Sequence, residues 1–574
     1  MKTHKLILFL LGIALSLPVF SQNVAPYDIL INEFLPDPTP QIGLPNAEFI
    51  ELFNRSSKTI NLKDFKIVNG TVSTVLPSFV LKPAAYVVIY TKKTGIDFSK
   101  FGDTLPVSKL VALSNPNDTF YLAAPNGDVI DAVSYDLTFY ENSKKADGGW
   151  SLERTQPNAP CNGLAWTASN DLLGGTPCKR NSVAVDWVDK TPPSIERYYL
   201  KDNKTLVVTF DKSLDRNAAI QTPQYQTLEN IKISSAKIFS PFFNTIQFSF
   251  SAILQPKSLY NVVIKSWLKD CQNASLPLSM ADTLTIQLPE KPAYNDLIIN
   301  EILVNPEVNG SRFLELYNRS EKALDIGGLK IIDSTRGDVK TIATNFLLLP
   351  KQYVALTENP PYIQKRYKAT SFGFSILKNK LPTWNETSGN VTIYAVEGSK
   401  AVILDYLSYD ESWHNPLLAS SEGVSLEKTY PNLPSANKIN WQSAAEKSSF
   451  GTPAYKNSQY RDPQDTPSVS GAFRLDRNTF SPDDDGFEDA LLIHYKLEKG
   501  GGLATVKIFD SNGHLATILT ANEVLATEGV LRWQGERSDG TKASVGVYIM
   551  VINTIFPTGS SIYQKLPFAL TTKF

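Results

Sequence analysis

Short apolar runs separated by turn residues fill most of the chain. The clearest runs are rich in Val, Ile, Tyr and Phe: YVVIY (86–90), TLVVTF (205–210), NVVIKSW (261–267), VTIYAV (391–396) and VYIMVI (547–552). Gly, Pro, Asn and Asp interrupt such runs about every eight to twelve residues. Beyond the N-terminal apolar run, we find no convincing helical periodicity. The pattern predicts an all-β protein made of sandwiches or barrels.

The chain contains the same segment twice. Ile29–Ser56 reads ILINEFLPDPTPQIGLPNAEFIELFNRS, and Ile298–Ser320 reads IINEILVNPEVNGSRFLELYNRS. The match resumes at Phe79 and Phe346, and it closes with SLERTQPN and GGTP in one copy and SLEKTYPN and FGTP in the other. Each copy spans about 155 residues, which is the size of a domain and far longer than a solenoid repeat. A duplicated domain favours a structural or binding array.

The length of 574 residues predicts about four domains. Composition and the repeat divide the chain into a signal peptide and four domains, with a polar, Pro-containing linker at 456–471. The predicted boundaries are 1–21 for the signal peptide, 26–179 for the first copy, 192–288 for an intervening domain, 295–455 for the second copy and 472–574 for the last domain.

The N-terminus has the features of an export signal. Lys2 and Lys5 precede the apolar run Leu6–Leu17, and the small residues Val19 and Ser21 suit a peptidase that cleaves after Ser21. An uncleaved anchor is the competing interpretation, but the run is short for a membrane-spanning helix. No other segment reaches transmembrane length. We therefore expect an extracellular or outer-surface protein without a membrane-spanning segment after cleavage.

The repeated unit resembles the lamin tail domain, an Ig-like β-sandwich. The residues that carry this resemblance are INEF (31–34) with EFIELFN (48–54), and INEI (299–302) with FLELYN (313–318). The resemblance implies an interaction module and no catalytic residues.

The other two domains also resemble families of β-sandwiches. TPPSIERYYLKDNKTLVVTFDKSLD, which opens the intervening domain, is similar to bacterial Ig-like domains. NTFSPDDDGFEDALLIHYKL (478–497) resembles the start of gliding-motility-associated C-terminal domains, and VKIFDSNG (506–513) resembles the Ig-like domain of flagellar hook-capping proteins. Together these resemblances imply tandem Ig-like β-sandwiches in a bacterial surface protein, with a last domain that serves in export or surface attachment.

An acidic loop in the last domain is the candidate metal site. Asp483, Asp485 and Asp489 surround a glycine that permits a sharp turn, and carboxylates on a flexible loop suit calcium. The alternative is a solvated acidic turn, with Arg474 and Arg477 just upstream to neutralise it. No other cofactor is expected.

Three cysteines occur in the chain. Cys161 and Cys178 lie in the first copy, and the second copy has none, so the fold requires neither. In an exported protein a local Cys161–Cys178 disulfide is expected, which leaves Cys271 unpaired and buried.

Paired glutamates recur inside the apolar strands of both copies. They are Glu33 with Glu51, and Glu301 with Glu315. Paired carboxylates suit acid–base chemistry, but a glutamate between strand hydrophobes more often faces solvent or pairs with arginine. Arg55 and Arg319 follow at the same spacing and are candidate partners.

Charge and motif content favour a protein that is not an enzyme. The 56 basic and 57 acidic residues provide no excess to hold nucleic acid, only four histidines occur, and no common catalytic motif is present. We expect adhesion, anchoring or scaffolding, with a protein or polysaccharide of the cell envelope or extracellular matrix as partner. The alternative is an accessory or degenerate component of an extracellular hydrolase system, whose tail-like domains bind polysaccharide or nucleic acid.

Overall fold

The computed structural model describes most of the chain after the N-terminal segment. The described residues are 24–572 without 164, 188, 228, 230, 265–267, 276–281, 368–374, 415–417, 419, 446–447, 461–471, 484–487, 498–501, 526–527 and 557–558. The predicted signal peptide therefore lies outside the described residues. The protein is 43% strand and 6% helix, arranged in many separate sheets, which confirms the all-β tandem sandwiches. The chain divides into two compact units, residues 1–140 with 144–188 and residues 141–143 with 189–574, and each is described by itself below.

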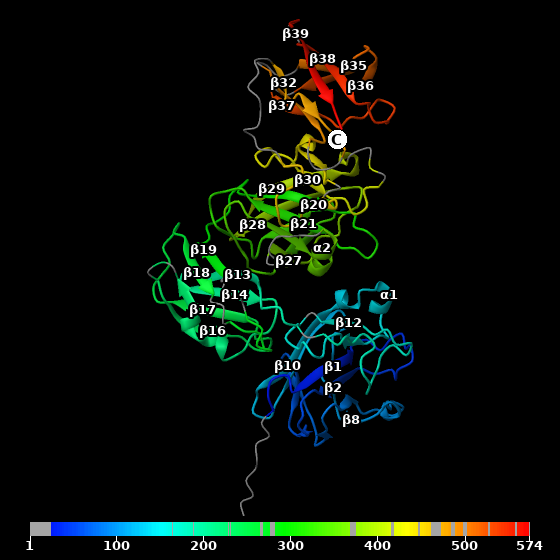
Figure 1. Ribbon diagram of the computed structural model, residues 1–574, viewed down its shortest axis with the longest axis vertical. Coiled ribbons are helices and arrows are strands. Elements are labelled where there is room, and N and C mark those ends of the chain that lie inside the picture. Colours follow the sequence, from blue (N-terminus) through cyan, green and yellow to red (C-terminus); the bar gives the residue numbers. More distant parts are fainter. Residues whose placement is uncertain are drawn as a thin grey trace, which may run out of the picture. The chain divides into compact units, whose positions relative to one another are not determined.

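The first repeat forms one sandwich, drawn from blue to cyan in Figure 1. Its six-stranded sheet has the order β12-β11-β1-β2-β7-β8 and its four-stranded sheet the order β10-β9-β4-β5, while β3 pairs with β6. Phe34 of the first sheet and Phe120 of the second meet edge to face in the core, with 5.3 Å between ring centroids. The elements are β1 Ile29–Leu35, β2 Phe49–Asn54, β3 Ile60–Asn61, β4 Lys66–Asn69, β5 Val72–Val75, β6 Val80–Leu81, β7 Tyr86–Thr91, β8 Thr104–Val107, β9 Asn117–Ala123, β10 Val129–Asp136, α1 Ser143–Ala146, β11 Leu152–Arg154 and β12 Trp166–Ala168.

The second repeat has the same topology. Its sheets have the orders β27-β26-β21-β20-β30-β31 and β24-β23-β28-β29, and β22 pairs with β25. The INE strand pairs with the glutamate-bearing strand that follows it in both copies, as predicted, and a register shift falls at Asn32 in one copy and at Asn300 in the other. The elements are β20 Leu297–Leu303, β21 Phe313–Asn318, β22 Leu324–Asp325, β23 Lys330–Asp333, β24 Asp338–Thr341, β25 Leu347–Leu348, β26 Tyr353–Thr357, α2 Pro360–Arg366, β27 Ile376–Lys378, β28 Ser388–Glu397, β29 Lys400–Asp410, β30 Leu426–Lys428 and β31 Trp441–Ser443.

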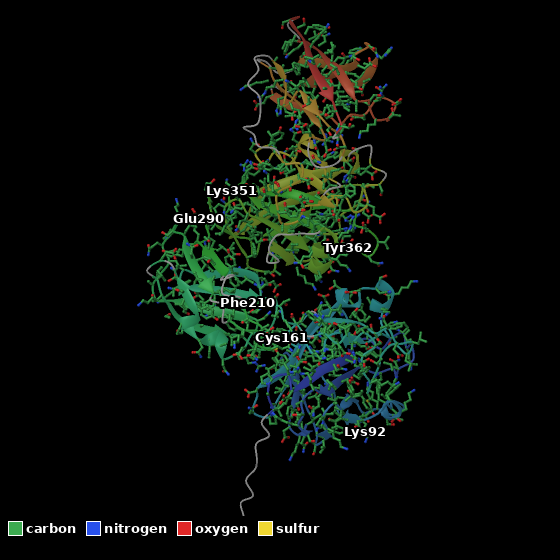
Figure 2. All side chains as sticks on the ribbon, in the orientation of Figure 1. Lys92, Cys161, Phe210, Glu290, Lys351 and Tyr362 are labelled. Carbon is green, nitrogen blue, oxygen red and sulfur yellow. The ribbon has the colours of Figure 1, made fainter. Side chains whose placement is uncertain are left out.

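Between the repeats lies a smaller sandwich of a four-stranded sheet, β13-β14-β17-β16, and a three-stranded sheet, β15-β18-β19. Its core includes Phe210, labelled in Figure 2, together with Phe248 and Val262, all fully buried. The elements are β13 Ile195–Asp202, β14 Thr205–Phe210, β15 Tyr225–Thr227, β16 Ile233–Ile238, β17 Thr245–Phe250, β18 Tyr260–Ile264 and β19 Asp282–Ile286.

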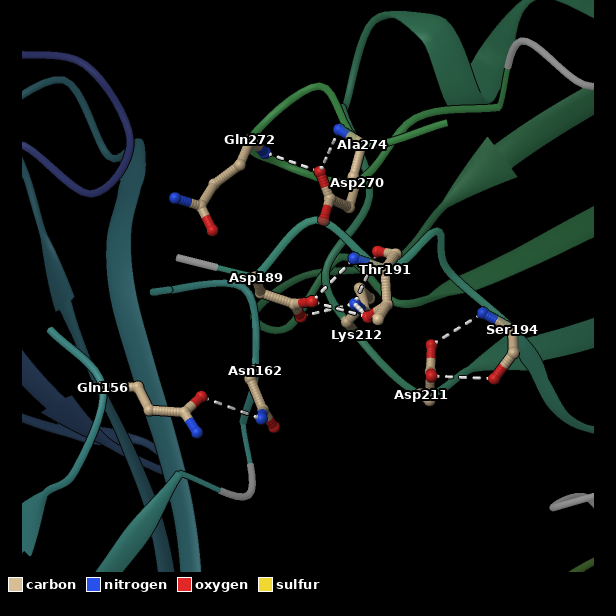
Figure 3. A network of polar contacts seen from close by, with 10 residues as sticks. All are labelled: Gln156, Asn162, Asp189, Thr191, Ser194, Asp211, Lys212, Asp270, Gln272 and Ala274. Carbon is tan, nitrogen blue, oxygen red and sulfur yellow. Dashed lines mark hydrogen bonds and ion pairs between the residues drawn. The ribbon is translucent and has the colours of Figure 1, made fainter. Parts of the chain in front are cut away.

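A buried ion pair fixes the entry into this intervening sandwich (Figure 3). The Lys212 ammonium donates to Asp189 Oδ2 at 2.6 Å and to the Thr191 carbonyl at 2.9 Å, and the Lys212 and Asp189 side chains are each 5% exposed. Because removing one partner would leave a buried charge uncompensated, this pair holds residues 189–191 against the sandwich.

The second repeat contributes apolar side chains to the core of the intervening sandwich. Ala323, Leu347 and Leu349 belong to the second repeat but pack within the core of the intervening sandwich. The Glu290 N–H, in the connection between them, donates to the Ala323 carbonyl at 2.8 Å. The residue next to Leu347 on β25, Leu348, packs instead into the core of the second repeat.

The C-terminal sandwich packs a three-stranded sheet, β32-β34-β37, on a five-stranded sheet, β33-β39-β38-β35-β36. Trp533 lies in its core against Phe480, Tyr548 and Phe568. The elements are β32 Phe473–Leu475, β33 Thr479–Phe480, β34 Leu491–Lys496, β35 Gly502–Asp510, β36 Leu515–Leu525, β37 Glu528–Trp533, β38 Gly546–Ile555 and β39 Ser561–Leu570.

Candidate functional site: two rows of buried carboxyl groups

Three glutamates lie side by side on the six-stranded sheet of the first repeat. Glu33 on the central strand β1 is directly opposite Glu51 on β2 and Glu153 on β11. Residues directly opposite across antiparallel strands point to the same face, so the three side chains form a row. All three residues are 0% exposed.

The second repeat contains the same row. Glu301 on β20 is opposite Glu315 on β21 and Glu427 on β30, and again all three residues are 0% exposed. These two sets of three glutamates are called the carboxyl rows below.

The segment after the last strand of each repeat covers the row. This cover segment comprises residues 175–183 in the first repeat and 451–459 in the second. In the first repeat the backbone of the cover segment passes so close to the sheet at position 175 that only glycine fits. A Cβ at Gly175 would lie 2.5 Å from Glu33 Oε1 and 2.8 Å from Ser151 Oγ. The central strand is consequently buried on both faces.

Groups of the cover segment and the sheet donate hydrogen bonds to the central glutamate. Ser151 Oγ and the Thr176 N–H donate to Glu33 Oε1 at 2.5 and 2.8 Å. In the second repeat Ser425 Oγ and the Thr452 N–H donate to Glu301 Oε1 at 2.5 and 2.8 Å. These contacts lie at equivalent positions in the two copies.

The outer glutamates of the first row accept hydrogen bonds from the cover segment and from the central strand. Asn32 Nδ2 donates to Glu51 Oε1 at 2.8 Å, and the Cys178 N–H donates to Glu51 Oε2. Ser182 Oγ donates to Glu153 Oε2 at 2.8 Å. The second row repeats this pattern: Asn300 and the Ala454 N–H donate to Glu315, and Ser458 Oγ donates to Glu427.

One threonine hydroxyl lies between two carboxyl groups in each repeat. Thr452 Oγ1 is 2.7 Å from Glu427 Oε1 and 3.0 Å from Glu301 Oε2. A hydroxyl has a single proton to donate, so the second contact requires a proton on a carboxyl group. Thr176 has the equivalent contacts, at 2.8 Å to Glu153 and 3.4 Å to Glu33.

Burial and mutual repulsion favour the protonated acids. Burial raises the pKa of Glu51 and of Glu301 to about 8. Burial, followed by repulsion from a neighbouring glutamate of the same row, raises the pKa of Glu33 and of Glu315 well above the usual range. The rows thus retain protons at neutral pH.

This arrangement suits holding the cover segment and does not suit a metal or a reactant. The carboxyl oxygens already face N–H and O–H donors, whose positive ends would repel a cation. No group of three or more His, Cys, Asp or Glu residues within the described parts of the chain has the geometry of a metal site. The full burial of the glutamates also leaves a substrate no access.

The expectation that these glutamates face solvent or pair with arginine is wrong. Arg55 Nε donates to the Tyr27 carbonyl at 3.3 Å, and Arg319 Nε donates to the Asn295 carbonyl at 3.1 Å. The reason is the cover segment, which buries the second face of the sheet and supplies the donors instead.

Sequence reasoning missed the third member of each row. Glu153 and Glu427 lie in the SLER and SLEK elements, which occur in both copies. A carboxylate retained at the same place in both copies of an apolar strand was the available signal.

The acidic loop of the last domain is only partly described. Asp485 lies outside the described residues, so the three predicted ligands cannot be placed together. Asp483 Oδ2 accepts from Ser481 Oγ at 2.9 Å, and Asp489 Oδ2 accepts from Gln459 Nε2 at 3.3 Å. Calcium binding by Asp483, Asp485 and Asp489 stays a prediction.

The predicted Cys161–Cys178 disulfide is wrong. Cys178 is a free cysteine, so no disulfide joins it to Cys161. The cover segment decides this, because it binds the Cys178 N–H to Glu51 and directs the thiol to the Asp103 carbonyl, 3.2 Å from Sγ. Burial, with repulsion from Glu51 next, raises the pKa of the Cys178 thiol to about 12.

Two stretches of the chain match the sequence model of the Lamin Tail Domain family, residues 22–136 and 290–410. These stretches lie in the two repeats and contain the first two glutamates of each row. The third glutamates, Glu153 and Glu427, and both cover segments lie beyond the matched stretches. The resemblance of the repeats to the lamin tail domain is confirmed over these two stretches.

Solved structures resemble the chain only weakly. The N-terminal part of the bacterial S-layer protein SbsC has a TM-score of 0.16 and 13% identity, over 38% of this chain and 44% of that one. A DUF4876 family protein from Bacteroides thetaiotaomicron has a TM-score of 0.19 and 13% identity, over 42% and 91%. A tetra-tandem repeat from the extending region of a large adhesion protein has a TM-score of 0.12 and 11% identity, over 95% and 100%. The chain spans less than half of the SbsC fragment.

No curated protein matches the sequence. Within the described residues, the structure contains no helix with the length and apolar character needed to cross a membrane.

Proposed function

We propose that this protein is a secreted, non-catalytic component of a bacterial cell surface that acts in adhesion, anchoring or scaffolding. Its partner is a protein or polysaccharide of the envelope or extracellular matrix. The export signal provides the route to the surface, and the four sandwiches provide an array of separate outer faces for contact.

The burial of the carboxyl rows is the observation that carries this proposal. In each tail-like repeat the row of three glutamates is 0% exposed and hydrogen-bonded to the cover segment. Carboxyl groups placed for acid–base catalysis must reach a substrate, directly or through one water. The rows stabilise the repeats and leave function to the surfaces.

Surface exposure on intact cells tests the proposal. We expect added protease to digest the native chain on intact producing cells, or the chain to appear in the medium with Gln22 as its first residue. Leu11→Arg places a charge in the apolar run and should keep the chain inside the cell. Thr3→Arg adds the same charge before the run and should leave export unchanged. A chain that is protected in intact cells and absent from the medium would contradict the proposed location.

Binding assays with the purified mature chain test the non-catalytic role. We expect it to cosediment with matrix polysaccharide or envelope protein without releasing soluble fragments. Fragment release that is abolished by Glu33→Gln or Glu301→Gln would instead establish a hydrolase, and fragment release only together with a second protein would establish an accessory subunit.

A further inference from the structure

The five-stranded sheet of the C-terminal sandwich has one face in the core and one face uncovered. Along β38 the inward residues Tyr548, Met550 and Ile552 are at most 2% exposed. The residues that alternate with them point outward, and Val547 and Ile549 are 55% and 39% exposed. A solvated outer face normally carries polar residues at such positions.

The exposed apolar residues are neighbours across the strands. Ile549 is directly opposite Phe509 on β35 and Pro567 on β39, and Phe509 is opposite Leu515 on β36. Further along the sheet, Leu503 of β35 is opposite Ile555 of β38. Ile549 and its neighbours therefore form one apolar cluster, and Leu503 with Ile555 forms a second, separated from the first by the polar pair Thr505 and Asn553 and by the row that contains Val551. The strands β36, β35, β38 and β39 that carry them are drawn in orange and red in Figure 1.

Two lysines lie between these apolar rows. Val551 is opposite Lys507 on one side and Lys565 on the other, and Lys507 is opposite Ile518. Lys565 Nζ also lies 5.9 Å from the centroid of the Tyr563 ring on the same face. At the described outward positions of β35, β38 and β39 there is no carboxylate to pair with these lysines. The outward residues of the four strands are called the outer face below.

The outer face has the size of an interaction surface. Strands about 4.8 Å apart and outward side chains about 6.8 Å apart give a flat area of about 500 Å² for four strands of four residues. One side of a standard protein interface buries about 800 Å² of accessible surface. The outer face can thus supply most of one side of a stable contact.

The charge and the shape of the outer face distinguish among a second copy of the chain, a lipid surface and a different protein as its partner. A second copy docked face to face would bring two more lysines and no carboxylate from the described outward positions of β35, β38 and β39 to the contact, and unpaired like charges in an interface are costly. A lipid surface is favoured by protruding Trp and Tyr side chains, but the apolar residues here are mostly aliphatic and spread over a flat sheet. A flat sheet buries such residues best against another flat protein layer.

We propose that the outer face docks onto a second protein, through an apolar surface whose carboxylates lie opposite Lys507 and Lys565. The contact would bury Ile549 and Tyr563 and would pair both lysines. It joins the last sandwich to a partner and leaves the two tail-like repeats free. The proposal does not depend on the function assigned to those repeats.

Site-specific photocrosslinking tests this contact in the full chain within the producing cells. The probe is p-benzoylphenylalanine at position 563, where Tyr563 is 64% exposed and an aromatic replacement preserves the local structure. We expect one dominant adduct with a different protein, attached next to an Asp or Glu residue. The double change Lys507→Glu with Lys565→Glu should lower the adduct yield by about tenfold or more.

A matched control separates this effect from general charge. Lys496→Glu with Lys542→Glu makes the same change at exposed lysines of the same domain that lie outside the outer face, and it should leave the yield unchanged. Changing the crosslinked carboxylate of the partner to Lys should restore the adduct with the charge-reversed chain. Equal hydrogen exchange of β38 in all variants confirms that the fold is intact.

The other outcomes overturn the proposal. An adduct with a second copy, together with self-association in sedimentation equilibrium, would make the outer face a homodimer interface. Binding to phosphatidylglycerol vesicles that is lost on charge reversal would make it a lipid-binding face. No adduct, or an adduct insensitive to reversal of both lysines, would show that this surface stays free.

Discussion

At the scale of single residues, each carboxyl row depends on where one proton lies. When Thr452 Oγ1 donates its single proton to Glu427, its contact with Glu301 needs a proton on the Glu301 carboxyl group. Glutamine in place of Glu301 could donate from its amide to the same hydroxyl and accept the same two hydrogen bonds from Ser425 and the Thr452 N–H. The neutral form of the row can therefore be mimicked by one substitution.

We predict that the second repeat is most stable in mild acid. Burial raises the pKa of Glu301 from 4.5 to about 8, so the native repeat holds a proton that the unfolded chain releases above about pH 4.5. The contribution of Glu301 to stability should be full below about pH 4.5 and decrease by about 1.4 kcal/mol for each pH unit up to about pH 8, and Glu315, whose pKa is also raised, should add to the loss. Hydrogen-exchange protection of residues 451–459, corrected for intrinsic rates at pH 5, 7 and 9, measures this loss.

Glu301→Gln should remove much of that pH dependence and be better protected than the native chain at pH 9. Glu321→Gln, at a position whose side chain is 83% exposed, is the matched control and should follow the native chain. Tyr353 and Tyr455 also lie near the row, and their raised pKa values leave them neutral across this range. Equal protection of the native chain at pH 5 and pH 9 would refute the proton-dependent row.

The cysteines give a second residue-scale prediction. In the exported protein, alkylation after unfolding without reductant should label Cys178, because its thiol is free in the structure. Cys178→Ala should change the free energy of unfolding by less than about 1 kcal/mol. The reason is that Ala454 takes the same place in the second repeat and still donates its N–H to Glu315. Labelled Cys161 with protected Cys178 would contradict the structure.

At the scale of elements, the cover segment stabilises each repeat only if it can lie close to the sheet. Gly175→Ala would place a Cβ 2.5 Å from Glu33 Oε1 and 2.7 Å from Leu44 Cδ1. We expect a loss of about 2 kcal/mol of unfolding free energy and faster exchange over 175–183. Gly163→Ala is the matched control, because a Cβ there meets nothing within 4 Å. Equal stability of the two variants would show that the segment is not tightly packed.

The acidic loop is tested as an element in the full chain. If it binds calcium, millimolar calcium should slow exchange at residues 478–483 and 488–497, by mass action on the bound state. Changing Asp483, Asp485 and Asp489 together to Ala should abolish the slowing and leave exchange in chelator unchanged. Exchange that is identical with calcium and with chelator would identify an acidic turn.

At the scale of the whole molecule, β25 connects two sandwiches through opposite faces. Leu347 packs in the core of the intervening sandwich, and Leu348 packs in the core of the second repeat. Each leucine to alanine change should cost about 2–5 kcal/mol, in different places. Leu347→Ala should raise exchange in β14 and β17, and Leu348→Ala should raise it in β21 and β26. Loss of protection confined to the second repeat in both variants would show that Leu347 does not stabilise the intervening sandwich.

The sequence alone determined the β class, the repeat and the pairing of the INE strand with its partner. These features depend on local alternation, on turn residues and on comparison of one copy with the other, all of which can be read along the chain. Glu33 and Glu301 could also be singled out, because a charged residue inside an apolar strand is unusual.

Only the tertiary structure decided the environment of those glutamates and the free state of Cys178. Glu33 meets Thr176 across 143 residues, and Glu301 meets Thr452 across 151. A segment that returns over such a distance turns an outward strand face into a buried one. It also fixes which way Cys178 points. Burial and donors of this kind arise from contacts between distant segments, so no local pattern in the sequence could reveal them.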